Sequence, residues 1–355
     1  MRVLLIRDGF IVVNKASYDL IFGLIWAFIS KRVNMFKELF LVIKINEDEP
    51  ANAFSMRQKQ LICEVLAHCA CGLDACKCAY IFDKKRPLIY VLILLPEEID
   101  SDTEKSLKHE VLEGRFAQQC DVLFSEKFPC FNEQCKDAGA LVMDMDMTTV
   151  QIEGIDEIAR CLNVFDDVAA ITAEAMHGKL DFAQSLTKRV ALLKGGNANE
   201  VLPKVKEIMV ETDGLDELLN YCNELKRHQE FKTCIASGGF HELIGVIKDR
   251  YGLDEVRANS LGIDEKGLFT GKVASAIVDA QAKADLVNDL MKSGIKHERV
   301  IVLGDGANDL KMIGQGGLGI AYHAKPKVQQ EARNVLNIGT LAAVKALLEL
   351  KSHLN

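Results

Sequence analysis

The sequence predicts an α/β fold, a parallel sheet with helices in the C-terminal part of the chain, preceded by a smaller α+β domain. Three observations indicate this. Strand-like and helix-like segments alternate from Gly139 onward, a pattern typical of parallel sheets. Before Cys135 the order of the expected elements is βαββαβ. The two parts also differ in composition, since eight of the eleven cysteines lie at or before Cys135.

The N-terminal domain, residues 1 to 135, is assigned from its hydrophobic periodicity. The order βαββαβ is ferredoxin-like, and that fold alone does not decide a function. The segments that predict its elements are LFLVIKI (39–45) for a strand, 52–70 for a helix, AYIF (79–82) and LIYVLILL (88–95) for a hairpin, 101–117 for a second helix and CDVLF (120–124) for a last strand.

The second domain is expected to cover residues 140 to 355, after the polar stretch KFPCFNEQCKDAG at 127 to 139. Its clear strands are ALVMD, KTCIAS (232–237) and RVIVLGD (299–305), each ending in a polar residue. The segment from about 152 to 210 is mostly helical and longer than a crossover helix requires. It therefore predicts a helical cap inserted over one end of the sheet.

Composition excludes several classes of protein. The formal net charge of -8 argues against a general nucleic-acid binder, which would need a basic face. No stretch approaches the ~20 apolar residues that span a bilayer, and the apolar segment Leu20 to Ile29 is too short. We therefore expect no membrane association. Cysteines without a secretory signal indicate reduced thiols and a cytoplasmic location.

The strongest chemical signal is LVMDMDMTTV, where an apolar run ends in Asp144 and Asp146. Carboxylates at the carboxyl end of a buried strand project into the crevice where open α/β sheets bind ligands. Close carboxylates repel each other unless a metal ion or a shared proton compensates. The pattern indicates a magnesium site, an acid/base pair or both, with two surface aspartates at a loop start as the alternative.

Three further clusters follow the same logic. Ser237 and Gly238 at the end of KTCIAS offer a hydroxyl and amide N–H groups to a phosphate, or else form a helix N-cap. Lys283 lies on an expected helix, where most lysines are simply solvated. LGDGANDLKMI supplies Asp305, Asn308 and Asp309 directly after a strand, again where neutral residues would be more stable.

In this order DMDMT, SGG, one helical lysine and GDGANDLKM resemble the haloacid dehalogenase (HAD) superfamily, and residues 140 to 330 resemble its phosphoserine phosphatases nearly continuously. The resemblance implies a HAD-like Rossmannoid sheet with a helical cap, and an N-terminal domain similar to the ACT-like modules of longer bacterial members. It also implies a function: Mg²⁺-dependent hydrolysis of O-phospho-L-serine to L-serine and phosphate, the last step of serine biosynthesis. A homodimer is left open.

The resemblance also implies roles for single residues. Asp144 would be the nucleophile and form an aspartyl-phosphate, and Asp146 would be the general acid and base. Lys283 would screen negative charge. Ser237 and Gly238 would hold phosphate oxygens, and Asn308 would contact substrate. Mg²⁺ would lie among these acids: Asp144, the backbone carbonyl of Asp146, Asp305 and, around the ion, Asp309.

Substrate choice is expected to come from the cap. Phe182, Ser185 and Arg189 share one face of a helix. Arg189 suits a carboxylate and Glu153 an ammonium group, while Met176 and Phe182 would close the site with apolar surface. The bland alternative is an ordinary amphipathic helix that exposes arginine and buries phenylalanine.

Two features fit the family less well. Met147 stands where the family usually has serine or glycine, which puts turnover in doubt. The cluster HCACGLDACKC, His68 to Cys78, either binds a metal, senses redox state or simply packs.

Two other functions remain open: a phosphatase or phosphotransferase for a related metabolite such as phosphothreonine or phosphohomoserine, and a catalytically weak amino-acid sensor.

Overall fold

The computed structural model describes residues 4–5, 10–12, 38–50, 52–96 and 99–354. The chain divides into two compact units: residues 1–135 together with 333–355, and residues 136–332. The C-terminal residues 333–355, which we expected in the second domain, thus group with the first. The apolar segment Leu20 to Ile29 lies outside the described residues. Within those that are described, no helix combines the length and hydropathy needed to cross a bilayer.

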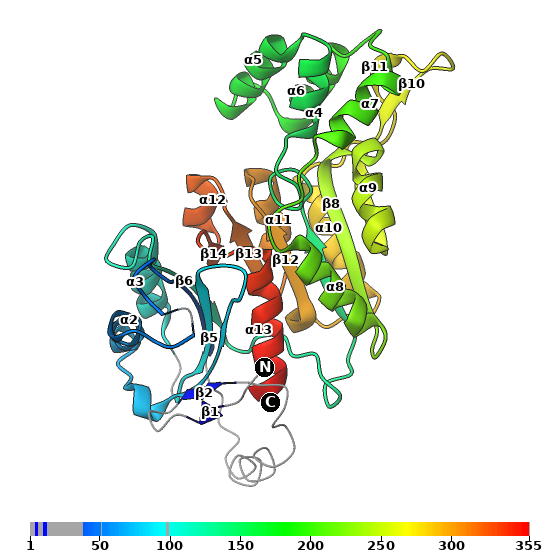
Figure 1. Ribbon diagram of the computed structural model, residues 1–355. Helices are drawn as coiled ribbons and strands as arrows, with labels where there is room; N and C mark the ends of the chain where they lie inside the picture. The colour runs from blue at the N-terminus through cyan, green and yellow to red at the C-terminus, as the bar shows by residue number, and fades with distance from the viewer. Residues whose placement is uncertain (1–3, 6–9, 13–37, 51, 97–98, 355) are drawn as a thin grey trace. The chain divides into compact units, whose positions relative to one another are not determined.

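The first unit contains the predicted βαββαβ order (Figure 1). Its sheet runs β1-β2-β4-β5-β3-β6, and β3 is antiparallel to both β5 and β6. Its last four strands have the ferredoxin-like order, as predicted. The elements are β1 (Leu4–Leu5), β2 (Phe10–Val12), β3 (Glu38–Lys44), α2 (Met56–His68), η1 (Leu73–Ala75), β4 (Lys77–Phe82), β5 (Leu88–Leu94), α3 (Ser101–Leu112) and β6 (Cys120–Ser125).

Both faces of this sheet are buried, which explains why the C-terminal residues join it. Leu39, Leu41 and Ile43 of β3 belong to the core that includes α2, while Phe40 on the opposite face is also fully buried. Helix α13 (Leu341–Leu354) packs against β4 and β5, and its Lys351 pairs with the buried Glu38 of β3. Continuous apolar strands such as β3 and β5 require cover on both sides.

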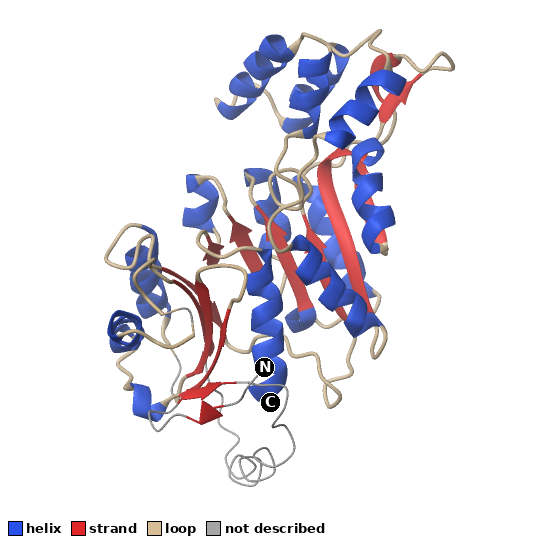
Figure 2. Ribbon diagram, viewed as in Figure 1, coloured by secondary structure: helices blue, strands red, loops and turns tan. Residues whose placement is uncertain are grey.

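The second unit is built on a parallel sheet, as the sequence predicts. Its strands lie in the order β13-β12-β7-β8-β9, with each neighbouring pair parallel (Figure 2). The three expected strands are confirmed, and two more are present that the sequence analysis did not identify. The strands are β7 (Gly139–Met143), β8 (Phe231–Phe240), β9 (Glu255–Asn259), β12 (Val300–Gly304) and β13 (Leu318–Tyr322).

A second segment of the chain contributes to the cap in addition to the inserted helices. Helices α4 to α7 share an apolar core with Leu261 and Phe269, which belong to a separate two-stranded ribbon. The Gly195 N–H donates to the Phe269 carbonyl at 2.8 Å, so the ribbon is fastened to the helices. The cap elements are α4 (Gly154–Cys161), α5 (Phe165–Met176), α6 (Phe182–Ala191), α7 (Ala198–Glu207), β10 (Leu261–Ile263) and β11 (Phe269–Val273).

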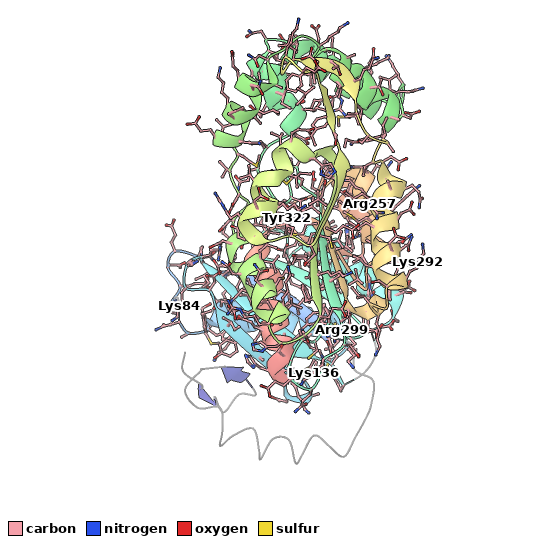
Figure 3. The ribbon with its side chains drawn as sticks, turned by 90° about the vertical axis from the view of Figure 1, so that its right-hand side faces the viewer. Lys84, Lys136, Arg257, Lys292, Arg299 and Tyr322 are labelled. Atoms are coloured by element: carbon pink, nitrogen blue, oxygen red, sulfur yellow. The ribbon has the colours of Figure 1, made fainter. Side chains whose placement is uncertain are left out.

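One arginine fastens the helix that carries Lys283. Arg257 of β9, which is labelled in Figure 3, forms an ion pair with Asp289 at 3.0 Å and donates to the Ala282 carbonyl at 3.3 Å. Asp279 caps the same helix by accepting from two backbone N–H groups. The remaining helices are α8 (Leu215–Lys226), α9 (His241–Tyr251), α10 (Ala280–Lys292), α11 (Leu310–Ile313) and α12 (Pro326–Glu331), with the 3-10 turns η2 (His297–Arg299) and η3 (Ala307–Asp309).

Candidate functional site

A buried lysine lies between two buried aspartates at the carboxyl end of the sheet. The Lys283 ammonium is 2.8 Å from Asp144 Oδ1 and 2.7 Å from Asp309 Oδ1. Lys283 and Asp309 are fully buried and Asp144 is nearly so. Lys283 therefore does not solvate a helix face, and Asp144 is no surface residue. Burial lowers the pKa of Lys283, but the two carboxylates raise it by more, so the lysine stays charged.

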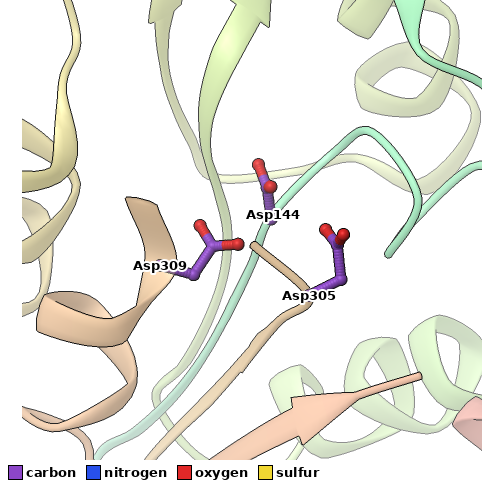
Figure 4. Close-up of side chains that lie close together, drawn as sticks. All are labelled: Asp144, Asp305 and Asp309. Atoms are coloured by element: carbon purple, nitrogen blue, oxygen red, sulfur yellow. The ribbon is translucent and has the colours of Figure 1, made fainter. Parts of the chain in front are cut away.

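Asp144, Asp305 and Asp309 come together from two strand ends that are far apart in the sequence. Their oxygens all lie within 4.8 Å of one another, and Figure 4 shows the three side chains converging. Burial, then the nearby Asp309, raises the pKa of Asp305 to about 6. Burial, then Asp309, also raises the pKa of Asp144, against the opposing effect of Lys283. One ammonium thus does not neutralise three acids.

This donor set fits a magnesium ion. Carboxylate oxygens are the ligands Mg²⁺ prefers in proteins, and Asp144, Asp305 and Asp309 bring one such oxygen each within 4.8 Å of the others. Among the described residues, no other group of three or more acidic, cysteine or histidine side chains is close enough to hold a metal.

Asp146 lies beside this cluster, half-buried at the edge of the cap. Burial, then the proximity of Glu153, raises the pKa of Asp146 to about 7. The Gly154 N–H donates to Asp146 Oδ1 at 3.3 Å, which ties the carboxylate to the start of α4. A carboxyl group with this pKa can carry a proton near neutral pH and also release it.

The segment Ser237-Gly238-Gly239 lies within β8 and not in a helix cap. Helix α9 begins at His241 with Phe240 as its N-cap, so the alternative that Ser237 caps it is wrong. The buried Ser237 Oγ accepts from the Gly239 N–H at 2.8 Å. A side chain at Gly239 would clash with Asp146, because a Cβ there would lie 2.8 Å from Asp146 Oδ2.

The cap reaches the strand end at Gly238. A Cβ at Gly238 would lie 2.8 Å from the ring of Phe182 in α6 and 3.7 Å from Asn308 Nδ2. Three of the expected substrate-binding residues therefore meet at one point. Only glycine leaves room there for the aromatic ring and keeps the backbone accessible.

Arg189 of α6 brings a positive charge with an unused donor to this region. Its Nε is buried and has no hydrogen-bond partner among the described residues. Burial lowers the pKa of Arg189, while Asp156, Glu153 and Asp146 oppose that shift. Burial raises the pKa of Glu153. A buried donor without an acceptor is costly, so the Nε of Arg189 is available to an acceptor that the described residues do not supply.

The sequence analysis missed two charged residues of the site, and one residue that it expected in the site is not placed there by the structure. Asp156, three residues after Glu153 on α4, and Lys325 both influence the pKa of Glu153. The i, i+3 spacing was the signal for Asp156. Met176 at the end of α5 is 74% exposed, so in this structure it does not close the site as expected.

Met147 has a strained backbone. Its φ is +56°, in the left-handed region, and its side chain is 43% exposed. That region costs an L-residue roughly 1–2 kcal/mol, and glycine adopts it freely. The conformation gives a physical reason why a small residue suits this turn.

We expect Met147→Gly to stabilise the protein by about 0.5–1 kcal/mol, since relief of the strain exceeds the entropy gained by the unfolded chain. Thermal unfolding measures this change. Met176→Gly, which also removes an exposed methionine but from a helix, should instead destabilise by about 1 kcal/mol. An unchanged or lower midpoint for Met147→Gly would contradict the strain argument.

Comparison with known proteins places this geometry in a family. The family model for haloacid dehalogenase-like hydrolases matches residues 139–317. The chain is 44% identical to the phosphoserine phosphatase of Haemophilus influenzae over 219 residues, 61% of this chain and 68% of that one. It resembles the solved structure of a probable phosphoserine phosphatase from Vibrio cholerae with a TM-score of 0.66 and 30% identity, over 90% of this chain and 88% of the other.

A third structure, described as a phospho-aspartyl intermediate analogue of phosphoserine phosphatase, is 36% identical with a TM-score of 0.54. It covers 60% of this chain and all of its own. The chain therefore belongs to the haloacid dehalogenase-like hydrolases, within their phosphoserine phosphatase family.

Proposed function

We propose that this protein is a Mg²⁺-dependent phosphoserine phosphatase, which hydrolyses O-phospho-L-serine to L-serine and phosphate through an aspartyl-phosphate on Asp144. The observation that carries the proposal is the buried pair of Lys283 and Asp144 beneath a cap that presents Arg189, whose Nε has no hydrogen-bond partner. The first feature suits phosphoryl transfer and the second suits an amino acid.

In the first step an oxygen of Asp144 attacks phosphorus and the bond from phosphorus to the serine oxygen breaks. Lys283 and the Met145 N–H, at 2.8 and 2.7 Å, hold Asp144 Oδ1 and so fix the direction of the carboxylate. Asp146, with its pKa of about 7, donates its proton to the leaving serine oxygen.

In the second step Asp146 accepts a proton from water as that water attacks phosphorus. The bond from phosphorus to Asp144 then breaks and phosphate leaves. Ser237 and the N–H of Gly238 hold phosphate oxygens, and Asn308 lies at the same strand end. The structure of a relative described as a phospho-aspartyl intermediate analogue supports this two-step course.

Asp144, Asp305 and the backbone carbonyl of Asp146 would hold Mg²⁺, with Asp309 orienting Lys283 beside it. When bound, the ion supplies the positive charge that lets a carboxylate approach a phosphate dianion. The raised pKa values of Asp144 and Asp305 support this assignment.

For the amino-acid part of the substrate, Arg189 would pair with the carboxylate and Glu153 with the ammonium group. Phe182 would cover the bound molecule from the cap. The residues up to 135, together with 333–355, would form an ACT-like regulatory domain, which the ferredoxin-like strand order supports.

We expect Asp144→Asn to lower kcat for phosphoserine by about 10⁴-fold or more, because loss of a catalytic nucleophile costs on this order. Phosphate release with Mg²⁺ measures the rate. Acid quenching during turnover of labelled phosphoserine should leave label on Asp144. Asp216→Asn, an exposed acid on α8, serves as the control. Label on another residue, or a variant that retains activity, would disprove the nucleophile.

We expect Arg189→Ala to lower kcat/KM for phosphoserine by about 10- to 100-fold, the value of charge-assisted hydrogen bonds. Phosphoethanolamine, which lacks the carboxylate, should be hydrolysed by the variant and the parent at similar rates. Lys188→Ala, on the exposed face of the same helix, is the matched control. An equal loss for both substrates would show that Arg189 is structural, and faster turnover of phosphothreonine by the parent would favour the related-substrate alternative.

We expect Mg²⁺ to raise the unfolding midpoint of metal-free protein, corresponding to about 2.7 kcal/mol at one hundred times its dissociation constant. Asp305→Asn should remove most of this stabilisation because it deletes a charged ligand. Asp166→Asn, an exposed acid of the cap, should leave the stabilisation intact. Equal Mg²⁺ stabilisation of Asp305→Asn and the parent would place the ion elsewhere.

A further inference from the structure

The cysteine-rich turn between α2 and β4 contains one closely spaced pair of thiols. Cys71 Sγ and Cys76 Sγ are 3.3 Å apart and share a hydrogen bond. The neighbouring cysteines are engaged otherwise: Cys69 Sγ donates to the Val65 carbonyl at 3.7 Å, and Cys78 is buried in β4. The cluster therefore consists of one close pair of thiols and two cysteines that are not part of it.

The backbone holds this pair in place. Ala70 has a φ of +51°, and the Cys71 N–H donates to the Leu66 carbonyl at 3.1 Å, which turns the chain back after α2. The Cys76 N–H donates to the Leu73 carbonyl at 3.1 Å and ends the short 3-10 turn. Both thiols thus project from defined turns and not from a loose loop.

The arrangement does not suit a metal. No three of these thiols and neighbouring acids gather closely enough to ligate an ion among the described residues. His68, the fifth candidate ligand, has its Nε2 2.6 Å from the guanidinium of Arg115 and its ring against Phe116. The described residues therefore do not give the zinc hypothesis a set of converging ligands.

We propose that Cys71 and Cys76 form a reversible disulfide, making the first unit a site of thiol oxidation by hydroperoxides. A disulfide needs sulfurs about 2.0 Å apart, so the pair must close by roughly 1.3 Å. Gly72 stands between them, and no heavy atom lies within 4 Å of the place where its Cβ would be. The turn therefore has room to adjust.

The two cysteines differ in a way that assigns their order of reaction. Cys71 is partly exposed, whereas Cys76 is 8% exposed. Burial, then the hydrogen bond that Cys76 makes with Cys71, raises the pKa of Cys76, so Cys76 remains a thiol. Cys71 is thus the sulfur that meets the oxidant and Cys76 the one that resolves it.

The chemistry balances with a hydroperoxide as the oxidant. Cys71 loses its thiol proton and its sulfur attacks the terminal peroxide oxygen; the O–O bond breaks, Cys71 becomes a sulfenic acid, and the other oxygen takes up the released proton and leaves as an alcohol or water. The Cys76 thiol then attacks the Cys71 sulfur and loses its proton, and the hydroxyl leaves as water. The two sulfurs together supply two electrons, and an external dithiol returns them by exchange.

The test treats the reduced full-length chain with hydrogen peroxide, alkylates the remaining thiols and maps peptides without reduction. We expect a cross-link between Cys71 and Cys76, loss of two alkylatable thiols out of eleven and recovery of both with dithiothreitol. Cys63→Ser, which removes an exposed thiol of α2, should keep the cross-link.

Two variants test the order of reaction. Cys76→Ser should accumulate a sulfenic acid on Cys71 that a 1,3-diketone traps, and Cys71→Ser should show neither that adduct nor the cross-link. Circular dichroism of both variants confirms that they fold. The proposal is overturned if the cross-link joins other cysteines, or if Cys71 and Cys76 remain alkylatable at peroxide doses that oxidise Cys63.

Discussion

The burial of Lys283 between Asp144 and Asp309 sets a condition for everything around it. An ammonium group removed from water is tolerable only when carboxylates surround it, and here two do. With Asp305 added, the acids outnumber the cation, so the strand ends carry excess negative charge. Neighbouring residues hold these groups in place. Arg257 forms an ion pair with the helix that carries Lys283, and glycines at the strand ends avoid side chains that would clash with the adjacent groups.

Most of the first unit could be predicted because its signals are local. Periodicity located β3 to β6 and both helices between them. The role of α13 could not be read locally, because the helix packs against β4 and β5, which lie more than two hundred residues earlier in the sequence. One clue was present: LFLVIKI and LIYVLILL are apolar on both faces, and a sheet built from them needs a second cover.

In the second unit the sequence analysis found strands that end in acids or serine and missed β9 and β13, which have no such ending. The ribbon β10–β11 was missed as well, since two short strands give little periodicity. The acids, Lys283 and the glycine segment lie together as motif spacing suggested, because parallel strands bring their carboxyl ends to one edge. Met176 and Lys325 depend on how the cap meets the sheet, which no local pattern encodes.

The strained backbone of Met147 is explained by the sharp turn that follows the neighbouring acids. The chain turns sharply after Asp146, so that Thr148 and Thr149 become fully buried and the Thr149 hydroxyl reaches back to the Asp144 carbonyl. A left-handed residue in between makes this reversal achievable. The turn therefore orders the strand end that carries Asp144, and Met147 adopts an unfavourable backbone conformation as a result.

The β10–β11 ribbon, which is hydrogen-bonded beside α6 and α7, affects how the lid is attached to the rest of the unit. Because the chain enters and leaves the lid twice, four separate tethers join it to the body beneath, and hydrogen bonds lock the two excursions together. Helices and ribbon are therefore held as one packed piece. The same apolar core takes in Phe240 of β8 and Leu243 of α9, so the lid is joined to the body by side-chain packing as well as by its tethers.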